Sequence, residues 1–530
     1  MTPRLALRAA AAACALLAGA CTHATKADDA NELRIAFSTE PHSLNPLDQR
    51  NGQEVVITRL FSDPLTSFDP SGNRVVPILA ARVPTRENGD VSRDGKTIVF
   101  HLRRGVRWQD GAPFTSADVA YTYQQVMSPE NEAVSRFGYD DIRSIDAPDA
   151  YTVRLHLTRA FSPIVTTFFG DANAPYGILP RHLLERYRTV ERIPFDSMPV
   201  GTGAFRVVSW RRGDRLELTA NPDYFRGTPR IARITIVFSH DEQALVTMAR
   251  AHEVDWVAEL SPTLVPAADA IAGYHVVLVA QNRWYGITFN LQRKPLQDVR
   301  VRRAVELAID KPAITRALTM RTASAATQDL PSFLWASGNL PPSPYDPARA
   351  RALLVAAGWP PGKPLRLEMT YNAGDETARK AAVLVQSALA NAGIVVDPKG
   401  YPNEMLTAPA SMGGIEYTGK FDLALGRIIN GPEPDNSAEY TCAGIPPNGY
   451  NFAHYCSPEM DRLQQIATSS YDRTTRRAAY AAIEALLERD LPQVPLWWPH
   501  DVHVVSDRLA NFDPNPFVET WDAWRWSLRR

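Results

Sequence analysis

The stretch HLRRGVRWQDGAPFTSADV, residues 101–119, leads from a predicted strand into a predicted helix and decides the fold of the first third of the chain. The side chains around its start alternate between two faces of a strand, with Ile98, Phe100 and Leu102 on one face and Val99, His101 and Arg103 on the other. Thr115 followed by Asp118 is a variant of the capping box that begins helices, and apolar side chains then recur on one helical face. A second alternating run follows at 151–157, so residues 61–195 are predicted to form an α+β lobe.

The length and composition of the chain limit the classes of protein to which it can belong. The chain has 530 residues, of which 45% are apolar and 22% charged, so it is predicted to fold into several domains of roughly 150 residues each. Lys and Arg together number 57, and Asp and Glu number 58, which leaves no excess of basic residues for binding nucleic acid. After the leader, no apolar run reaches the roughly 20 residues of a membrane-spanning helix. These observations exclude a nucleic-acid-binding protein and an integral membrane protein.

The amino-terminal residues MTPRLALRAAAAACALLAGAC, 1–21, resemble an export signal. Two arginines precede an apolar stretch of the length found in secretory signals, and small residues then lead directly to Cys21, as in a bacterial lipobox. We therefore expect residues 1–20 to be a lipoprotein signal peptide, Cys21 to be lipidated, and residues 21–32 to tether the protein to membrane lipid. The alternative is an ordinary signal peptide that is cleaved nearby.

The cysteines fit an exported protein. Two of the four lie in the leader, and the other two, Cys442 and Cys456, lie close together near the carboxyl terminus. After export to an oxidising space, such a pair is predicted to form a disulfide. The alternative is a metal site with two cysteine ligands, but the nearby His454 does not complete a usual zinc spacing.

The rest of the chain alternates strands and helices. Between residues 201 and 280 strands predominate, with one helix near 241–251. After residue 290 caps, apolar faces and terminal glycines predict helices at 298–309, 347–357, 375–392, 458–468 and 473–489. Strands at 365–371 and 394–396 flank one of these helices and complete a βαβ-like unit. No flexible linker separates these elements, which indicates a chain that passes back and forth between its lobes.

The motifs of common catalytic and nucleotide-binding sites are absent. Gly95-Lys96-Thr97 has its preceding glycine at the wrong spacing for a phosphate-binding loop, and a strand follows where a helix is required. Gly201-Thr202-Gly203 lacks the third glycine of a dinucleotide fingerprint. His101, His156 and the pair Asp140-Asp141 are predicted to be solvated. We therefore predict a binding protein without catalytic residue, metal or cofactor; the alternative is an exported hydrolase whose carboxylate pair matches no motif.

Five segments, in order along the chain, carry a resemblance to one family. They are HLRRGVRWQDGAPFTSADV at 101–119, VGTGAFRVVSW at 200–210 with NPDYF at 221–225, FN at 289–290 with DVRVRRAVELAID at 298–310, YDP at 345–347 with LLVAAG at 353–358, and LPQVPL at 491–496. Together they resemble the extracellular solute-binding proteins of ABC transporters, family 5, of the dipeptide- and oligopeptide-binding type.

The resemblance implies a fold of the α/β class. In this periplasmic-binding-protein type II fold, two α/β lobes joined by a hinge close on a ligand, and an extra α+β lobe is added near the amino terminus. Lobe I would combine 33–60, 196–283 and 505–530, the extra lobe would be 61–195, and lobe II would be 284–504. The chain would cross between lobes I and II near Asn282–Asn290 and Pro495–Ser506.

The resemblance also implies a function. The chain would be the periplasmic substrate-binding component of an ABC importer, anchored to the membrane as a lipoprotein. It would capture short peptides by closing its lobes, because a ligand that contacts both lobes favours the closed state. It would then deliver them to a permease in the inner membrane. The alternative ligand is another elongated solute, such as a metal chelate, an opine-like compound or a sugar-peptide.

One departure from the family concerns the peptide's amino end. Peptide-binding members carry a Trp and, three residues later, an Asp that pairs with the α-ammonium group, whereas the alignment places Arg427 and Asn430 at these positions. A neutral amide cannot replace a carboxylate as counter-ion to a buried ammonium group. Either Glu433 or Asp435 takes over this role, or the ligand lacks a free amino end and Arg427 binds a carboxylate or phosphate. The alternative for Arg427 is a surface position without a ligand.

Three further residues are candidate ligand contacts. Trp284 and Tyr285 lie at the first expected crossing between the lobes and would line the cleft, although a buried aromatic plug at the hinge is an equal alternative. Glu40 ends the first predicted strand, where it would either contact the ligand or serve as a structural cap.

Overall fold

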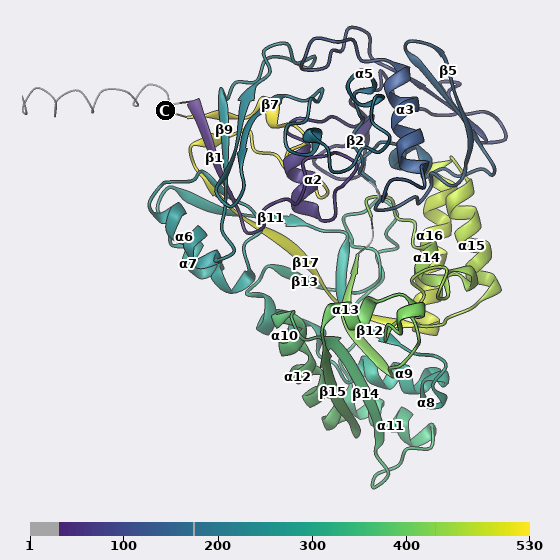
Figure 1. The fold of residues 1–530 in the computed structure, drawn as a ribbon. Coiled ribbons are helices and arrows are strands. Elements are labelled where there is room, and N and C mark those ends of the chain that lie inside the picture. Colours follow the sequence, from purple (N-terminus) through teal and green to yellow (C-terminus); the bar gives the residue numbers. More distant parts are fainter. Residues whose placement is uncertain (1–30, 173–174, 430, 530) are drawn as a thin grey trace, which may run out of the picture.

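A twelve-stranded sheet runs through two of the three regions expected from the sequence (Figure 1). The structure is a computed structural model, and it describes residues 31–172, 175–429 and 431–529. The expected signal peptide, Cys21 and most of the tether lie outside these residues, as does Asn430. Within the described residues, no helix has the length and apolar character needed to cross a membrane. We keep the names lobe I, extra lobe and lobe II for the three regions.

Lobe I is built around strand β1 (Glu32–Phe37), whose apolar side chains are buried. β1 lies between β9 (Arg233–Phe238) and β10 (Trp256–Val257) and runs parallel to both. Strands β8 (Arg215–Ala220) and β7 (Phe205–Arg211) extend the sheet in antiparallel order. The other elements are α2 (Gly52–Thr58), α6 (Glu242–Arg250), η3 (Pro262–Leu264), α7 (Val265–Asp269), β11 (Tyr274–Ala280), β18 (Leu509–Ala510), η6 (Ala523–Arg525) and β19 (Ser527–Leu528).

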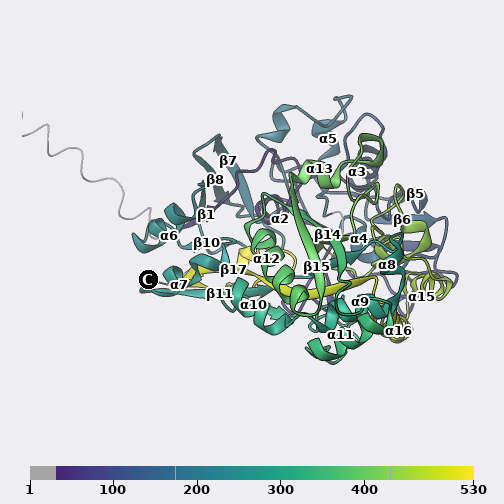
Figure 2. The same cartoon turned by 90° about the horizontal axis from the view of Figure 1, so that it is seen from below.

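One long strand, β17 (Gln493–Ser506), joins the two halves of the sheet. Its first residues, Gln493–Trp497, pair with β12 (Arg283–Phe289) in lobe II, and its last residues pair with β10 and β11 in lobe I. Figure 2 shows β17 passing from the side of α7 toward the side of α9 and α16. β17 and the short link between β11 and β12 therefore connect the two halves of the sheet, whereas the boundaries of the lobes stay predictions.

Lobe II surrounds the other half of the sheet, in the order β15-β14-β16-β12. Its strands are β12, β13 (Ala323–Ala325), β14 (Leu365–Asn372), β15 (Ile394–Tyr401) and β16 (Leu423–Ile429). Its helices are α8 (Lys294–Gln297), α9 (Val299–Leu307), α10 (Lys311–Thr319), α11 (Pro347–Ala356), α12 (Glu376–Asn391), α13 (Asn403–Thr407), η4 (Ala410–Met412), α14 (Ser437–Tyr440), η5 (Cys442–Gly444), α15 (Pro458–Ser469) and α16 (Arg473–Asp490). The caps of three helices, Asp298, Asp346 and Asp375, each accept a hydrogen bond from a backbone N–H in the first turn.

The extra lobe has a separate three-stranded antiparallel sheet, in the order β4-β6-β5. Helix α3 (Ser116–Met127) packs against it, and the predicted capping box of Thr115 and Asp118 is present at its start. The remaining elements are β2 (Thr66–Phe68), β3 (Val75–Pro77), β4 (Thr97–His101), β5 (Ile142–Asp149), β6 (Thr152–Leu157), α4 (Ile164–Thr167), α5 (Arg181–Leu184) and η2 (Pro194–Asp196). The region is an α+β unit, as the alternating runs predicted.

The buried apolar side chains form separate cores. One core lies between Leu47 and Phe195 in the extra lobe and its border, and another surrounds β12, β14 and β16 in lobe II. Lobe I has one core on each side of β1, and α14, α15 and α16 enclose a further core. The buried apolar side chains of the described residues therefore form several separate cores rather than one continuous core.

The two glycine motifs have packing roles. A Cβ atom at Gly201 would lie 1.8 Å from the carbonyl oxygen of Phe61, and Gly203 donates a backbone hydrogen bond to that oxygen at 2.9 Å. Gly95 has φ +70° and lies against the ring of Tyr471 from lobe II. Both motifs thus allow close approach between segments of the chain.

Candidate ligand-binding cleft

Two cavities lie on either side of Arg283, in the first crossing between the lobes. The first, which we call the hinge cavity, has a volume of about 240 Å³. It is lined from lobe I by Glu259–Pro262, from lobe II by Tyr285 and Arg427, and by the middle of β17. The second, which we call the three-lobe cavity, has a volume of about 340 Å³ and is lined by residues of lobe I, the extra lobe and the loop at Gly431. Both volumes suit small solutes, which commonly bind between rigid lobes.

An acidic cluster borders the hinge cavity, which two of its members, Glu259 and Asp501, line. Carboxylate oxygens of Glu259, Asp501 and Glu519 all lie within 4.8 Å of one another, and the guanidinium group of Arg283 forms an ion pair with Asp501. Gln53 Nε2 donates to Glu259 Oε2 at 3.1 Å. Burial and the neighbouring carboxylates of Asp501 and Glu519 raise the pKa of Glu259 to about 7. The cluster is thus an acidic wall in which one carboxyl group takes up a proton near neutral pH.

Strand alternation places the two aromatic candidates on opposite faces of β12. Tyr285 lines the hinge cavity, stacks on Trp497 with ring centroids 4.9 Å apart, and donates its hydroxyl hydrogen bond to Asp375 Oδ2 at 2.6 Å. Trp284 is fully buried, and its Nε1 donates to Asp329 Oδ1 at 2.8 Å. Tyr285 therefore borders the hinge cavity and Trp284 does not, and the roles of both toward a ligand stay predictions.

Arg427 lies across the β12–β16 ladder from Tyr285 and is exposed. It borders the hinge cavity and a further cavity of about 250 Å³ on lobe II, which is lined by Asn372, Glu416 and Phe452 among others. No carboxylate among the described residues forms an ion pair with Arg427. Its guanidinium group is thus available for an anionic group of a ligand.

The two acidic residues of the loop after β16 make structural contacts, although Asp435 Oδ2 has no hydrogen-bond partner among the described residues. Glu433 is buried, forms an ion pair with Arg476 and accepts a hydrogen bond from Thr166 Oγ1 of the extra lobe at 3.1 Å. Asp435 accepts from the backbone N–H of Ser437 at 3.0 Å, and burial raises the pKa of its carboxyl group. Neither residue lines the cavities described above, so both remain predictions as ligand contacts, and Asn430 lies outside the described residues.

Glu40 has the geometry of a cap. It accepts hydrogen bonds from Trp210 Nε1 at 2.9 Å and from the backbone N–H of Gly213 at 3.0 Å. Both partners belong to the β7–β8 hairpin of lobe I, so the carboxylate holds this hairpin against the end of β1.

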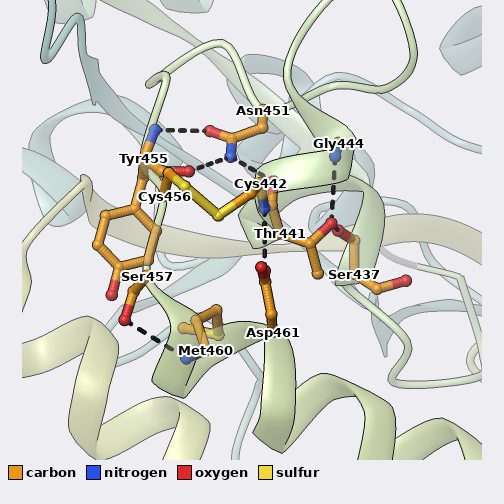
Figure 3. Close-up of a disulfide and its surroundings, with 10 residues drawn as sticks. All are labelled: Ser437, Thr441, Cys442, Gly444, Asn451, Tyr455, Cys456, Ser457, Met460 and Asp461. Carbon is orange, nitrogen blue, oxygen red and sulfur yellow. Dashed lines mark hydrogen bonds between the residues drawn. A yellow bond between two sulfur atoms is a disulfide. The ribbon is translucent and has the colours of Figure 1, made fainter.

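The predicted disulfide between Cys442 and Cys456 is present, and the alternative of a metal site with two cysteine ligands is wrong (Figure 3). The bond ties the end of α14 and η5 to the start of α15. The backbone N–H of Cys442 donates to Asp461 Oδ1 at 2.9 Å, and the side chain of Asn451 bonds to Thr441 and Tyr455 around the sulfur bridge. The disulfide therefore fixes a long loop of lobe II.

Several residues that line the two cavities were not predicted from the sequence. Arg283 and Asp501 lie in the predicted crossings, so their position beside the hinge could have marked them as candidates. Gln49, Asp171 and Glu259 carry no motif, and no local pattern brings them together. Only long-range packing places Gln49 and Asp171 at the three-lobe cavity and Glu259 at the hinge cavity.

The chain resembles proteins of known type over nearly its whole length. A di/tripeptide-binding protein of Pseudomonas aeruginosa is 28% identical over 529 residues, 94% of each chain, and a glutathione-binding protein of Pectobacterium atrosepticum is 27% identical over 493 residues, 91% of each chain. Among solved structures, HbpA2 from Haemophilus parasuis superposes with a TM-score of 0.81 at 21% identity, over 94% of this chain and 100% of that one.

A second solved structure, the oligopeptide-binding protein AppA of Bacillus subtilis in complex with a nonapeptide, superposes with a TM-score of 0.74 at 22% identity, over 94% of this chain and 99% of that one. These two superpositions confirm the predicted α/β fold. Residues 74–446, most of the chain, match the middle region of one family. The chain belongs to the bacterial extracellular solute-binding proteins, family 5.

Proposed function

We propose that this protein is the substrate-binding component of an ABC importer and captures short peptides in the cleft between lobes I and II. Its relatives of similar length are named for di- and tripeptides and for glutathione, itself a tripeptide derivative, which favours peptides over the metal chelate, opine-like or sugar-peptide alternative. The closed protein would deliver its ligand to a permease in the inner membrane. In this role it binds without chemical change and is not an enzyme.

The observation that carries the proposal is a free strand edge in the cleft. β16 pairs with β12 along its length, but with β14 only at Leu423–Leu425. On that second edge, no described strand pairs with Gly426–Ile429. An extended peptide can add to such an edge through backbone hydrogen bonds, which do not depend on its side chains. This geometry suits a receptor that accepts peptides of varied sequence.

Arg427 would fix the orientation in which the peptide binds. It belongs to the free part of the edge, is exposed, and borders the hinge cavity and the neighbouring cavity of lobe II. A guanidinium group binds a carboxylate with two parallel hydrogen bonds. We propose that Arg427 binds the carboxyl end of the peptide, with Tyr285 beside it.

Isothermal titration calorimetry with mature protein and Ala-Ala-Ala tests the proposal. We expect binding and, at a ligand concentration of 100 times Kd, a stabilisation of about 2.7 kcal/mol seen as a raised Tm. Mass spectrometry should recover the peptide intact, since no hydrolysis is expected. If no member of a mixed di- and tripeptide library binds at millimolar concentration, peptides are not the ligands.

The proposal also includes export of the protein, its anchoring to the membrane and the boundaries of its lobes. We propose a signal peptide over residues 1–20, a lipid anchor on Cys21 with a tether to residue 32, and the lobe boundaries predicted from the sequence. The separate buried cores support these boundaries. Metabolic labelling with a fatty acid should mark the wild-type protein but not Cys21→Ala. An exported wild-type protein of unmodified mass would contradict the anchor.

A further inference from the structure

A cavity of about 510 Å³ on the extra lobe is lined by cationic side chains. We call it the arginine cavity, because Arg82, Arg103 and Arg104 line it together with His101. Three of these four residues belong to HLRRGV, residues 101–106, the start of the first segment that carries the family resemblance. No residue that lines the arginine cavity lines the hinge cavity or the three-lobe cavity. The arginine cavity is therefore separate from the proposed peptide cleft, and peptide binding leaves its positive charge unexplained.

Among the described residues, the positive charges at the arginine cavity outnumber the carboxylates that pair with them. Arg82 Nε lies 2.6 Å from Asp90 Oδ2, and His101 Nε2 lies 3.1 Å from Oδ1 of the same carboxylate. Asp90 is 4% exposed and does not line the cavity. No carboxylate of the described residues forms an ion pair with Arg103 or Arg104. Three guanidinium groups therefore have one carboxylate between them, which leaves two positive charges unpaired.

A second acidic residue, Asp149, offsets this excess only weakly. It lies outside the lining of the cavity and accepts a hydrogen bond from the backbone N–H of Tyr151 at 2.8 Å. Hydrogen bonds from Tyr151 and Thr152, and the charges of Arg104 and His101, lower the pKa of its carboxyl group. Asp149 is exposed, so water and salt screen its attraction for the guanidinium groups.

Neutral contacts hold the two unpaired guanidinium groups in place. Arg103 Nε donates to the carbonyl oxygen of Ile78 at 2.5 Å, and its Nη2 donates to that of Pro77 at 3.3 Å. The guanidinium carbon of Arg104 lies 4.6 Å from the centroid of the Tyr151 ring. These contacts fix the two groups without supplying a full negative charge, and the remaining N–H donors stay available for an anion. Such preorganisation lowers the cost of ordering the side chains on binding.

The charge and the lining of the cavity favour one class of anion. A phosphate monoester carries about −1.5 to −2 charges at pH 7 and three acceptor oxygens, which matches two unpaired guanidinium groups. A carboxylate brings one charge and is satisfied by a single guanidinium group. Leu102, Val106 and Phe225 add apolar surface to the lining, and the volume is in the range of small-molecule pockets. The phosphate should therefore carry an organic group.

We propose that the arginine cavity binds a phosphate monoester of a small organic molecule, with Arg103 and Arg104 as the principal contacts of the phosphate. The site is additional to the peptide cleft and does not depend on the proposed function. Two sources supply this chemistry, a soluble phosphate ester and the headgroup of phosphatidic acid in a membrane, and the experiment separates them.

Isothermal titration calorimetry with the mature protein and glycerol phosphate tests the proposal. We expect the wild type to bind glycerol phosphate at least about 10-fold more tightly than glycerate, a carboxylate of similar size. Arg104 is exposed and its side chain makes no hydrogen bond with the described residues, so Arg104→Gln should fold normally. The variant should bind glycerol phosphate about 10-fold more weakly, because a charged hydrogen-bond donor is lost. Arg93→Gln, at an exposed position of the extra lobe outside the cavity, is the matched control and should bind as the wild type does.

Sedimentation with vesicles of phosphatidylcholine and phosphatidic acid identifies the source, using Cys21→Ala protein so that no acyl chain contributes. Co-sedimentation that Arg104→Gln abolishes would support the lipid headgroup, and binding of glycerol phosphate alone would support a soluble ester. Absence of binding to both, equal affinity for glycerol phosphate and glycerate, or unchanged binding by Arg104→Gln would overturn the proposal. Ala-Ala-Ala should bind equally to wild type and Arg104→Gln, and a wild type that binds no peptide would contradict only the proposed function.

Discussion

Among single side chains, Glu259 should make the stability of the protein depend on pH. Its pKa of about 7 in the folded protein lies above the ordinary value of 4.5, so between these values the folded state binds more protons than the unfolded state. The free energy of unfolding should therefore fall as pH rises from about 5 to about 7 and change little above that. Glu259→Gln should remove on the order of 1 kcal/mol of this fall.

Urea unfolding at pH 5 and pH 8 measures this effect. Asp501 and Glu519 remain in the variant, and burial also raises the pKa of Asp501, so part of the pH dependence should persist. Glu87→Gln, at an exposed loop position, is the control and should leave the dependence unchanged. An equal fall in Glu259→Gln and wild type would show that Glu259 stays ionised in the folded protein.

Arg427 provides a second prediction at this scale. If its guanidinium group binds the ligand's carboxylate, Arg427→Ala should weaken binding of Ala-Ala-Ala by about 10- to 100-fold, the range expected for a hydrogen bond to a charged group. The amidated peptide lacks the carboxylate, so its affinity should be the same for variant and wild type. Arg349→Ala, exposed on α11, is the control. Equal weakening for both peptides would assign Arg427 to the structure of the cleft instead.

At the scale of elements, the disulfide should stabilise the loop between α14 and α15. The cysteines are 14 residues apart, and closing a loop of this length is worth about 3 kcal/mol in the chain-entropy account. The double variant Cys442→Ser/Cys456→Ser should lose about this much free energy of unfolding in urea. Reductant should lower wild-type stability to that of the variant and leave the variant unchanged. A wild type insensitive to reductant under unfolding conditions would contradict the prediction.

Elements were predictable where local interactions decide them. A few neighbouring residues determine the cap at Asp346 and the capping box at Thr115, and both helices begin close to the predicted positions. The faces of β12 were not predictable. Alternation separates Trp284 from Tyr285, but it does not indicate which of these two buried side chains borders the hinge cavity, because that depends on segments distant along the chain.

The cleft was predictable only in part, for the same reason. The family resemblance pointed to Arg427 and to both crossings, whereas polar side chains that line the three-lobe cavity come from segments near residues 49, 171 and 282. No spacing in the sequence relates these segments. Their meeting depends on how the extra lobe packs against lobe I, which sequence patterns do not encode locally.

At the scale of the whole molecule, direct contacts join the extra lobe to lobe II. The hydroxyl of Tyr471, in lobe II, bonds to the carbonyl oxygens of Gly95 and Phe161 at 3.1 and 3.0 Å. The backbone N–H of Ser162 donates to the carbonyl oxygen of Thr468 at 2.7 Å. Figure 1 shows α15 and α16 lying beneath the extra lobe, where these contacts are made. If lobe II swings away from lobe I when the cleft opens, these contacts are made only in the closed protein.

Tyr471→Phe tests this coupling, since it removes the hydroxyl from a site that borders none of the cleft cavities described above. A contact made only in the closed state contributes to ligand affinity by raising the population of that state. Loss of a hydrogen bond worth about 1 kcal/mol should therefore weaken peptide binding about 5-fold. Small-angle X-ray scattering should show a larger radius of gyration for the variant at partial saturation. Tyr345→Phe, at an exposed position, is the control. Unchanged affinity would mean that the extra lobe moves together with lobe II, and that closure occurs against lobe I alone.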